Sequence, residues 1–389
     1  MKSMPCKVLL VASCSDLSSG ATWSLIGLAN NLNELGLTVE VLLPYKGDCE
    51  PVLREKGIKI HHIKYYSYPS WVKNITKIYS FIPSCIKSLV NFIAHIRVFL
   101  LIICQKYDVI HINALTSCLG AHEALLLKKK LVWHVREFME EDICSTFSRK
   151  EAAYSLISKA SHIISISESV LKKHYQYLKK NKNISVIYNG VSTEFAQPHK
   201  CLLEKNKCTI LVVGRIMPKK NQFLACQAIC NLIKNGVTGV HLKVIGKVED
   251  NKYYKNICQY IKDNKLNTYI HVVPPSKKIE KEYQSADIVL SCADNEAFGR
   301  TTVEAMLSGC LVIGSNSAGT GELIQDNVTG LLFQKNSISD LAECINKAIA
   351  NPEKSNLIAC RAQREAKTKF TSMKNAESIA FVYRRICVE

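Results

Sequence analysis

The stretch that decides the fold is CADNEAFGRTTVEAMLSGCLVIGSNSAGTGELI, which occupies residues 292–324. An apolar run at 286–291 precedes it and predicts a buried strand. After a polar loop, the periodic run at 303–308 predicts a helix that ends at Gly309. The apolar run at 311–314 predicts the next strand. The stretch therefore predicts a strand–loop–helix–strand unit, whose polar helix N-terminus suits a phosphate group.

Two carboxylates lie on either side of this helix start. Glu296 precedes the helix and Glu304 lies about one turn inside it. At a rise of roughly 1.5 Å per residue plus a short loop, they are expected on the order of 10 Å apart. This is too far for two carboxylates that act on one glycosidic bond, but it suits the hydroxyl groups at the two ends of a sugar–pyrophosphate–ribose. A solvated loop glutamate and a surface helix glutamate would have the same spacing, so spacing alone leaves both interpretations open.

The residues around the two glutamates resemble a known signature. Glu296 and Glu304, with Phe-Gly at 298–299 between them and Ala-Met at 305–306 after them, resemble the motif of family 4 retaining glycosyltransferases of the GT-B fold. The resemblance implies that Glu296 contacts the donor sugar and that Glu304 contacts the ribose hydroxyls of the nucleotide. Leu311 departs from the family, which often has proline there, but it lies in a predicted strand.

A second part of the resemblance follows a predicted strand at 208–213. This strand ends at Gly214-Arg215, and Lys220 precedes a predicted helix at 222–234. The resemblance implies that Arg215 and Lys220 bind the donor diphosphate. The chemistry agrees, because negative charge builds on the leaving diphosphate as the glycosyl bond breaks. Two solvated basic side chains are the alternative. Gly246, after a further predicted strand, is expected to let the nucleotide base approach the backbone.

The first half of the chain begins with a βαβ pattern: strand 7–13, helix 22–35 and strand 38–43. It lacks a full GxGxxG, so a nicotinamide or flavin site is not supported. The loop at 15–21, which contains Gly20, resembles the glycine-containing loop whose backbone N–H groups face the donor phosphate and the acceptor in the family. A simple βα turn is the alternative interpretation.

Two histidines end predicted strands, His111 at 108–112 and His134 at 131–135. Ligands bind outside the carboxyl ends of strands in open α/β sheets. In the resembling family a histidine at the place of His134 lies near the donor sugar, so His134 is preferred. Arg136 and Glu137 would line the acceptor side or form a salt bridge, and the sequence leaves both open.

The expected site residues follow from these motifs. The residues expected to be catalytic are His134, Glu296, Arg215 and Lys220. The residues expected to bind the donor are Gly20, Gly214, Arg215, Lys220, Glu296, Phe298, Gly299, Arg300, Thr301 and Glu304. No metal site is expected, because no Asp-x-Asp motif lies at a strand end.

The segment 65–106 starts with aromatic residues and lysines and ends in an apolar run at 88–104. His95 and Arg97 interrupt this run, so we expect it to fall short of the ~20 apolar residues of a spanning helix. It predicts either an interfacial helix or a helix packed on the sheet. Lipid-acceptor glycosyltransferases of this fold often meet the membrane through the N-terminal domain.

Composition limits the partners and the compartment. The formal net charge of +18 favours polyanions or an anionic membrane surface. No helix-turn-helix, zinc-finger or RRM signature is present, so no nucleic-acid partner is expected. The 17 cysteines include no CxxC pair, which indicates free thiols in a reducing compartment. We therefore expect a cytoplasmic protein that is peripheral on the inner face of the plasma membrane.

The predicted fold class is α/β, of the GT-B type, with two Rossmann-like domains that face each other across a cleft. The expected divisions are an acceptor-binding domain at 1–195, a linker at 196–207, a nucleotide-sugar-binding domain at 208–370 and a helix at 371–389 that crosses back to the first domain. The resemblance covers nearly the whole chain, and its motifs are most specific at 215–221 and 296–306.

The predicted function is retaining, metal-independent transfer of a hexose-type sugar from a nucleotide-diphospho-sugar, with UDP-sugars favoured and no cofactor. The expected acceptor is a saccharide or a polyprenyl-linked saccharide in bacterial surface polysaccharide biosynthesis. A sugar-nucleotide epimerase of the same fold and a non-catalytic basic protein that binds nucleic acid or lipid are the alternatives.

Overall fold

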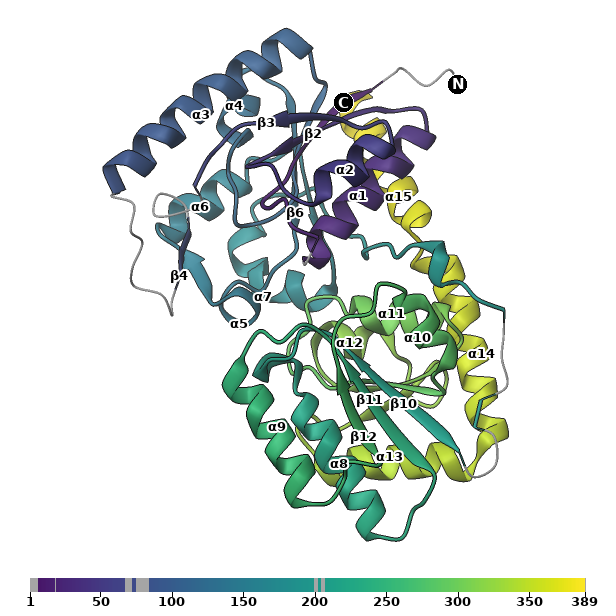
Figure 1. Cartoon of the computed structure of the whole chain (residues 1–389). Helices are drawn as coiled ribbons and strands as arrows, with labels where there is room; N and C mark the ends of the chain where they lie inside the picture. Colours follow the sequence, from purple (N-terminus) through teal and green to yellow (C-terminus); the bar gives the residue numbers. More distant parts are fainter. Residues whose placement is uncertain are drawn as a thin grey trace. The chain divides into compact units, whose positions relative to one another are not determined.

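The structure is a computed structural model that describes residues 6–17, 19–66, 72–74, 84–198, 202–203 and 207–388. The chain divides into two compact units (Figure 1). Unit 1 consists of Met1–Gly190 and Ser372–Glu389, and unit 2 consists of Val191–Thr371. Each unit is a parallel sheet with helices, so the predicted α/β class is confirmed.

Unit 1 contains a seven-stranded parallel sheet in the order β3-β2-β1-β5-β6-β8-β9. Its strands are β1 (Lys7–Val11), β2 (Thr38–Leu43), β3 (Lys59–His62), β5 (Val109–Ile112), β6 (Lys130–Val135), β8 (His162–Ser165) and β9 (Ile184–Val186). β4 (Val72–Asn74) and β7 (Ser145–Phe147) form a separate antiparallel pair. Every residue of β5 and β8 is buried, because helices cover both faces of a parallel sheet.

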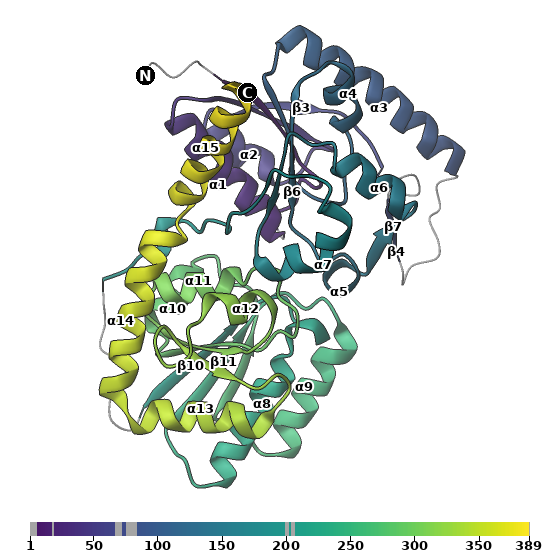
Figure 2. The ribbon, with the colours of Figure 1, turned by 180° about the vertical axis from the view of Figure 1, so that it is seen from behind.

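The helices of unit 1 join segments that are far apart in sequence. They are α1 (Gly20–Glu34), α2 (Cys49–Glu55), α3 (Ser84–Gln105), α4 (Ala121–Leu126), α5 (Glu140–Ile143), α6 (Lys150–Ile157), α7 (Glu168–Leu178) and α15 (Ser372–Val388). The C-terminal α15 packs beside α1, as Figures 1 and 2 show. Leu25 and Leu28 of α1 share one buried core with Ile379 and Tyr383 of α15, so this last helix is an integral part of unit 1.

Unit 2 contains a six-stranded parallel sheet in the order β12-β11-β10-β13-β14-β15. Its strands are β10 (Cys208–Val213), β11 (Val240–Ile245), β12 (Ile270–Val273), β13 (Ile288–Ser291), β14 (Leu311–Ser315) and β15 (Leu331–Phe333). Its helices are η1 (Thr193–Phe195), η2 (Pro218–Lys220), α8 (Gln222–Lys234), α9 (Asn251–Asp263), α10 (Ile279–Ser285), α11 (Arg300–Leu307), α12 (Ala318–Leu323), α13 (Ile338–Ala350) and α14 (Pro352–Lys369). The predicted strand–loop–helix–strand unit is therefore β13, α11 and β14.

The division between the units lies at Gly190/Val191, whereas the sequence prediction placed it at residue 195. The described residues of the predicted linker at 196–207 pack on unit 2. Gln197 donates its backbone N–H to Leu307, and Leu202 and Leu203 are buried in the core of this unit. A polar composition suggested a linker here, but these buried contacts hold the segment against unit 2.

Gly246 has a structural role in unit 2. A Cβ atom at this position would lie 1.8 Å from the carbonyl oxygen of Gly214. The close approach of these two backbones, after β10 and β11, therefore accounts for the glycine without the nucleotide base that the sequence suggested.

Replacing Gly246 by alanine is expected to destabilise unit 2 by about 3 kcal/mol or more, because backbone must move to admit the methyl group. Urea-induced unfolding of the full chain measures this change. The matched control is Gly27→Ala in α1, where the new Cβ would meet Ser372 Oγ at an ordinary 3.4 Å. That control should be neutral or stabilising by about 0.5–1 kcal/mol, and wild-type stability in Gly246→Ala would contradict the packing argument.

The helix α3 is longer than the apolar run from which it was predicted, because it begins at Ser84. We expected this segment to be too short to span a membrane, and the length of α3 shows that this expectation is wrong. Within the described residues, α3 is the one helix that by length and composition alone could cross a membrane. Residues 67–71 and 75–83 of the predicted aromatic and lysine-rich segment lie outside the described residues.

The cysteines of the described chain are all free thiols. Many of them, such as Cys226, Cys292 and Cys310, are buried in unit 2, and burial raises the pKa of the Cys292 thiol. They therefore act as small apolar side chains of the core.

Candidate functional site

The candidate site of unit 2 lies where the strand order reverses. β10 and β13 are neighbours, and the chain proceeds outward from β10 to β11 and β12 on one side, and from β13 to β14 and β15 on the other. Ligands of open α/β sheets bind outside the carboxyl ends of the strands at such a switch point. The loops after β10 and after β13 both begin at this edge, and they carry most of the predicted donor-binding residues.

Lys220 and Glu296 meet across these two loops. The Nζ atom of Lys220 donates a hydrogen bond to Oε2 of Glu296 at 2.6 Å, and both side chains are about three-quarters buried. The aliphatic stem of Lys220 runs past Gly214, whose Cβ position would lie 3.8 Å from the Cδ atom of the lysine. The φ of Gly214 is 149°, which L side chains rarely adopt. The structure thus brings three predicted residues together.

A set of polar contacts fixes the loop that carries Glu296. The backbone N–H of Gly319 donates to the carbonyl oxygen of Glu296 at 2.8 Å. Asn221 Nδ2 donates to Oδ1 of Asn336 at 3.0 Å, and Asn336 Nδ2 lies 3.5 Å from Oδ2 of Asp294. The loop after β10 is thereby linked through Asn336 to the loop after β13.

The helix α11 begins at Arg300, three residues before its predicted start, so Thr301 lies in its first turn. Gly299 is the N-cap, with a φ of 97° and no side chain to accept a first-turn N–H. A side chain at residue 299 would also approach Leu323 Cδ1 to 3.1 Å and Thr302 Oγ1 to 3.3 Å. The helix start therefore has no side-chain cap, and its binding of a phosphate group stays a prediction.

Glu304 is held by two donors inside unit 2. Its Oε2 atom accepts the hydroxyl of Tyr283 at 2.9 Å, and its Oε1 atom accepts Nε of Arg300 at 2.7 Å. Burial, with the Glu304 charge beside it, raises the pKa of Tyr283 well above its usual value, so the hydroxyl remains a donor. Sequence reasoning missed Tyr283, because a tyrosine in the preceding helix α10 carries no signal for a contact with α11.

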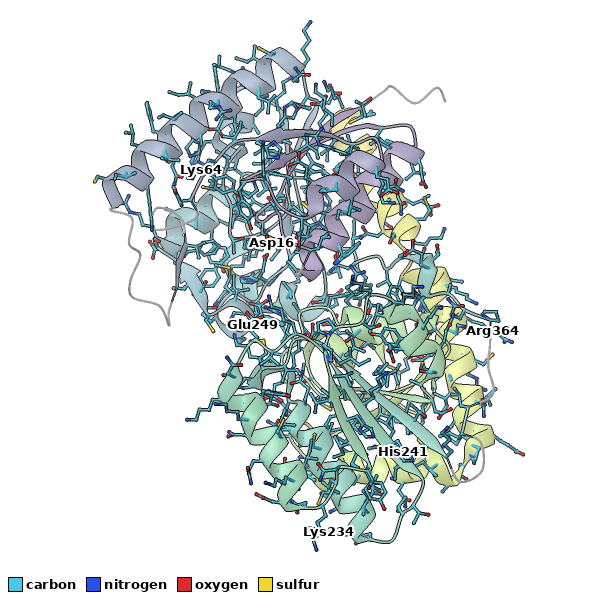
Figure 3. The ribbon with its side chains drawn as sticks, in the orientation of Figure 1. Asp16, Lys64, Lys234, His241, Glu249 and Arg364 are labelled. Atoms are coloured by element: carbon cyan, nitrogen blue, oxygen red, sulfur yellow. The ribbon has the colours of Figure 1, made fainter. Side chains whose placement is uncertain are left out.

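Arg215 is the more loosely held of the two predicted cations. Its Nη1 atom lies 3.6 Å from Oε2 of Glu249, and both side chains are about half exposed, so the pair contributes little to stability. Glu249 is labelled in Figure 3. The carbonyl oxygen of Arg215 accepts Nε2 of Gln222 at 2.8 Å, which fixes the backbone and leaves the guanidinium able to turn to a ligand.

Phe298 is 4% exposed, and its ring lies edge-to-face with the ring of Phe370 at 6.5 Å between centroids. Its side chain therefore packs inside unit 2. The predicted role of Phe298 in donor binding stays a prediction.

Unpaired buried atoms gather around the same two loops. In the described part of unit 2, the buried side-chain polar atoms without a hydrogen-bond partner are Gln222 Oε1, Asp294 Oδ1 and Thr302 Oγ1. Native proteins pair nearly all such atoms. Gln222 begins α8, Asp294 lies in the loop after β13 and Thr302 lies in the first turn of α11, so all three follow the strands of the switch point. This arrangement is typical of a site that a polar ligand or ordered water completes.

Gly20 and its loop lie in unit 1. Gly20 is the exposed first residue of α1, and the N-cap Ser19 accepts the backbone N–H of Ala21 at 3.3 Å. The loop before it is fixed, because Ser15 Oγ donates to the carbonyl oxygen of Tyr45 at 2.7 Å. The expected contact of this loop with the donor phosphate stays a prediction.

His134 has no exposed surface and belongs to a buried polar chain in unit 1. Its Nδ1 atom lies 3.2 Å from Nη2 of Arg136 and 3.3 Å from Nε2 of His111, whose Nδ1 is 2.5 Å from the hydroxyl of Tyr383. A guanidinium can only donate, so Nδ1 of His134 accepts and its Nε2 carries the proton. That Nε2 atom has no hydrogen-bond partner among the described residues. The catalytic role of His134 stays a prediction, and any role in this conformation is that of a donor.

The sequence left Arg136 and Glu137 between two interpretations. In the structure the Arg136 guanidinium donates to amide oxygens, and the Glu137 carboxylate accepts backbone N–H groups, one of them that of Arg136 at 3.3 Å. Arg136 Nε donates to Oδ1 of Asn113 at 3.1 Å, and its Nη1 donates to Oδ1 of Asn189 at 2.5 Å. Glu137 Oε2 accepts the backbone N–H of Leu115 at 2.9 Å. Burial raises the pKa of Glu137 to about 7.

Acidification is expected to destabilise unit 1 through this histidine pair. Burial, and then the Arg136 charge, lowers the pKa of His111 to about 3, and the same causes lower the pKa of His134 well below its usual value. In the unfolded chain both histidines have ordinary pKa values near 6.5. Between pH values of about 6.5 and 3 the unfolded chain therefore binds more protons than the folded chain, so the free energy of unfolding falls as the pH drops. Each histidine should cost about 2 kcal/mol at pH ~5.

Urea unfolding at pH ~7.5 and ~5 measures this loss. In His111→Asn, whose amide oxygen can still accept from Tyr383, the loss on acidification should be about 2 kcal/mol smaller than in the wild type, because the contribution of one histidine is gone. An equal loss in wild type and variant would contradict the assignment.

No group of three or more His, Cys, Asp or Glu side chains that could hold a metal ion occurs in the described ranges. The predicted metal independence is not tested by this observation and stays a prediction.

Two family models match the chain. The model described as Glycosyl transferases group 1 matches residues 194–365, and the model described as Glycosyltransferase Family 4 matches residues 18–195. Among curated relatives, the uncharacterized glycosyltransferase MJ1178 of Methanocaldococcus jannaschii is 29% identical over 245 residues, which are 61% of this chain and 63% of the relative. MJ1069 of the same organism, also named a glycosyltransferase, is 23% identical over 361 residues, which are 86% of this chain and 88% of the relative.

Solved structures with the same fold cover nearly the whole chain. A glycosyltransferase from Rickettsia africae has a TM-score of 0.80 at 19% identity, with 98% of each chain covered. HepE of Anabaena, solved in complex with UDP-glucose, has a TM-score of 0.77 at 22% identity, with 97% of this chain and 98% of HepE covered. At these identities the likeness shows the fold.

Proposed function

The chain belongs to the glycosyltransferases of group 1 and family 4, and from this premise we propose that it transfers a sugar from a nucleotide-diphospho-sugar with retention of configuration. Its fold is the predicted GT-B fold. The proposed acceptor is a saccharide or polyprenyl-linked saccharide of a bacterial surface polysaccharide pathway, on the cytoplasmic side. UDP-sugars are favoured, because HepE was solved with UDP-glucose.

The observation that carries the donor site is the convergence of charge and unpaired polar atoms at the switch point of unit 2. Lys220 and Arg215 follow β10, and Glu296 and the open helix start follow β13. The diphosphate would lie against the two cations and the first-turn N–H groups of α11. This placement leaves Glu304 for the ribose hydroxyls and Glu296 for the sugar hydroxyls.

The Lys220–Glu296 pair prepares the site for a charged leaving group. A lysine ammonium has three N–H donors, and its bond to Glu296 uses one of them. The carboxylate thus fixes the ammonium while the remaining donors serve the diphosphate. Charge that is already positioned stabilises the developing negative charge without reorganisation during the reaction.

The proposed reaction breaks the bond between the anomeric carbon and the diphosphate oxygen and forms a bond to the acceptor oxygen on the same face. The acceptor hydroxyl proton passes to the leaving diphosphate. Arg215, Lys220 and the α11 N-terminus supply positive charge at this group, so we propose that no divalent metal is required.

The test is turnover of UDP-glucose and other nucleotide-sugars by the full chain, with and without a polyprenyl-diphosphate-linked saccharide and with and without EDTA. We expect nucleotide release only when acceptor is present, no effect of EDTA, and a product with the anomeric configuration of the donor. Turnover of donor alone to an epimer would support the epimerase alternative. Vesicle or RNA binding without any turnover would support the non-catalytic alternative.

A further inference from the structure

The helix α3 of unit 1 exposes an apolar stripe along its length. Its exposed large apolar side chains are Ile86, Leu89, Phe92, Ile93, Ile96, Leu100 and Ile103. Phe92 is 64% exposed and Leu89 is 60% exposed. At about 1.5 Å per residue the 22-residue helix is roughly 33 Å long. A contiguous apolar surface of this extent on a folded domain marks an interaction site.

The opposite side of α3 is anchored in unit 1. Ala94, Val98 and Ile102 recur every four residues and are buried. Asn91 exchanges two hydrogen bonds of 2.7 Å with the backbone of Tyr66. A membrane-crossing position would strip the helix of these contacts and leave their polar groups unpaired in lipid. The geometry therefore favours an α3 that remains packed on unit 1 and exposes its other, apolar face.

The segment of sequence that contains α3 carries only positive charge, although Glu123 contacts His95 of α3 and Glu40 pairs with Lys59. From residue 56 to residue 107 the sequence contains eight Lys or Arg and no Asp or Glu. Lys64, labelled in Figure 3, places its Nζ atom 5.6 Å from the ring of Tyr66, whose backbone is bonded to α3. Lys59 donates to Gln105 at the C-terminal end of the helix, and Arg97 is exposed beside the stripe. An anionic lipid surface attracts such a cluster by about 1 kcal/mol per basic residue.

The residues that flank the stripe distinguish lipid from a partner helix. Without Phe92, which lies beside them, the exposed apolar residues of the stripe have the alternating three- and four-residue spacing of a coiled-coil seam. In coiled coils the flanking positions carry charges that select the partner. Here they carry Cys85, Phe92 and Cys104, all exposed, and Arg97 is the only charged residue among them. The apolar face is therefore wider than a two-helix seam and suits a helix lying in the plane of a membrane.

We propose that α3 is an in-plane docking helix that seats unit 1 on an anionic membrane surface, with its stripe in the acyl–headgroup boundary and the neighbouring cations on the headgroups. This inference goes beyond the proposed transfer reaction and does not depend on it. Vesicle binding is measured without donor or acceptor, so a chain that does not bind vesicles could still transfer sugar. Likewise, a chain that does not transfer sugar could still bind vesicles.

The test is co-sedimentation of the full chain with vesicles of phosphatidylcholine alone or with about 30% phosphatidylglycerol. The wild type should bind the anionic vesicles, bind neutral ones more weakly, and release as salt is raised. The variant Leu89→Gln/Ile96→Gln removes two exposed apolar side chains and should weaken binding by about a hundredfold or more. The matched control is Leu357→Gln, which alters a side chain 50% exposed on α14 of unit 2 and should bind like the wild type.

Three results would overturn the inference. The first is no binding to either vesicle, or equal binding by wild type and double variant. The second is a dimer in solution that the double variant dissociates, which would assign the stripe to a second copy of the chain. The third is a chain that stays in the membrane fraction until detergent is added, which would assign α3 to a spanning role. Circular dichroism and the melting temperature establish that the variants are folded.

Discussion

Replacing Glu296 by glutamine is expected to lower kcat/KM for sugar transfer by about 10²–10³-fold, the range found when one preorganised electrostatic group is removed. The change keeps the shape of the side chain and removes its charge. The carboxylate of Glu296 is the partner of Lys220 at 2.6 Å, so the glutamine also releases the ammonium from its fixed position. Initial rates with a UDP-sugar and an acceptor measure the loss.

The matched control is Glu343→Gln in α13. Glu343 forms an ion pair of 2.7 Å with Lys347, but both side chains are largely exposed and far along the chain from the switch point. Both variants should keep the wild-type melting temperature within a few degrees, because partly exposed ion pairs contribute at most about 1 kcal/mol. A Glu296→Gln enzyme with wild-type turnover would remove this residue from the mechanism.

Replacing Glu304 by glutamine is expected to weaken binding of the nucleotide by about 10- to 100-fold, because charge-assisted bonds to ribose hydroxyls become neutral ones. The variant Glu304→Ala should in addition destabilise unit 2 by about 2–4 kcal/mol, because Arg300 and Tyr283 both lose their acceptor. Calorimetric titration with UDP and urea unfolding separate these two effects.

Tyr283→Phe is the companion variant. It keeps the carboxylate of Glu304 and its bond from Arg300, and it removes only the tyrosine hydroxyl. We expect a smaller loss of affinity than in Glu304→Gln. Unchanged affinity for UDP in a folded Glu304→Gln variant would show that the ribose lies elsewhere.

The sequence predicts that both Lys220 and Glu296 follow strands of the second sheet, but not that the two side chains pair. Each follows an apolar run that predicts a strand, and the carboxyl ends of neighbouring parallel strands lie at one edge of a sheet. The sequence does not state which strands are neighbours. The structure supplies this point, because β10 and β13 are adjacent although β11 and β12 lie between them in sequence.

Other features depend on tertiary contacts that leave no local signal. Tyr283 reaches Glu304 only because α10 and α11 come together. His134 ends its strand as predicted, but the helix α15, from the far end of the chain, brings Tyr383 into its buried neighbourhood. Residue 246 must be a glycine because the backbone of Gly214 lies too close to admit a Cβ atom. The sequence around neither glycine predicts this close approach.

For the helix α3, the sequence did not predict which face is buried. Its apolar composition was evident, but composition does not tell a buried face from an exposed one when both are apolar. The buried stripe of Ala94, Val98 and Ile102 and the exposed stripe that contains Leu89 and Ile96 share one sequence of 22 residues. Only the packing of α3 on unit 1 assigns each face its surroundings.

The central claim is that unit 2 binds a nucleotide-diphospho-sugar at the switch point between β10 and β13. The most direct measurement is the melting temperature of the full chain with UDP-, GDP- and ADP-sugars, each with and without EDTA, in the wild type and in Glu304→Gln. At a ligand concentration about 100 times the Kd, binding stabilises the folded state by about 2.7 kcal/mol. The account predicts an upward shift with one nucleotide class, UDP-sugars being favoured, that EDTA leaves unchanged and Glu304→Gln reduces. An unchanged melting temperature with every nucleotide-sugar would contradict it.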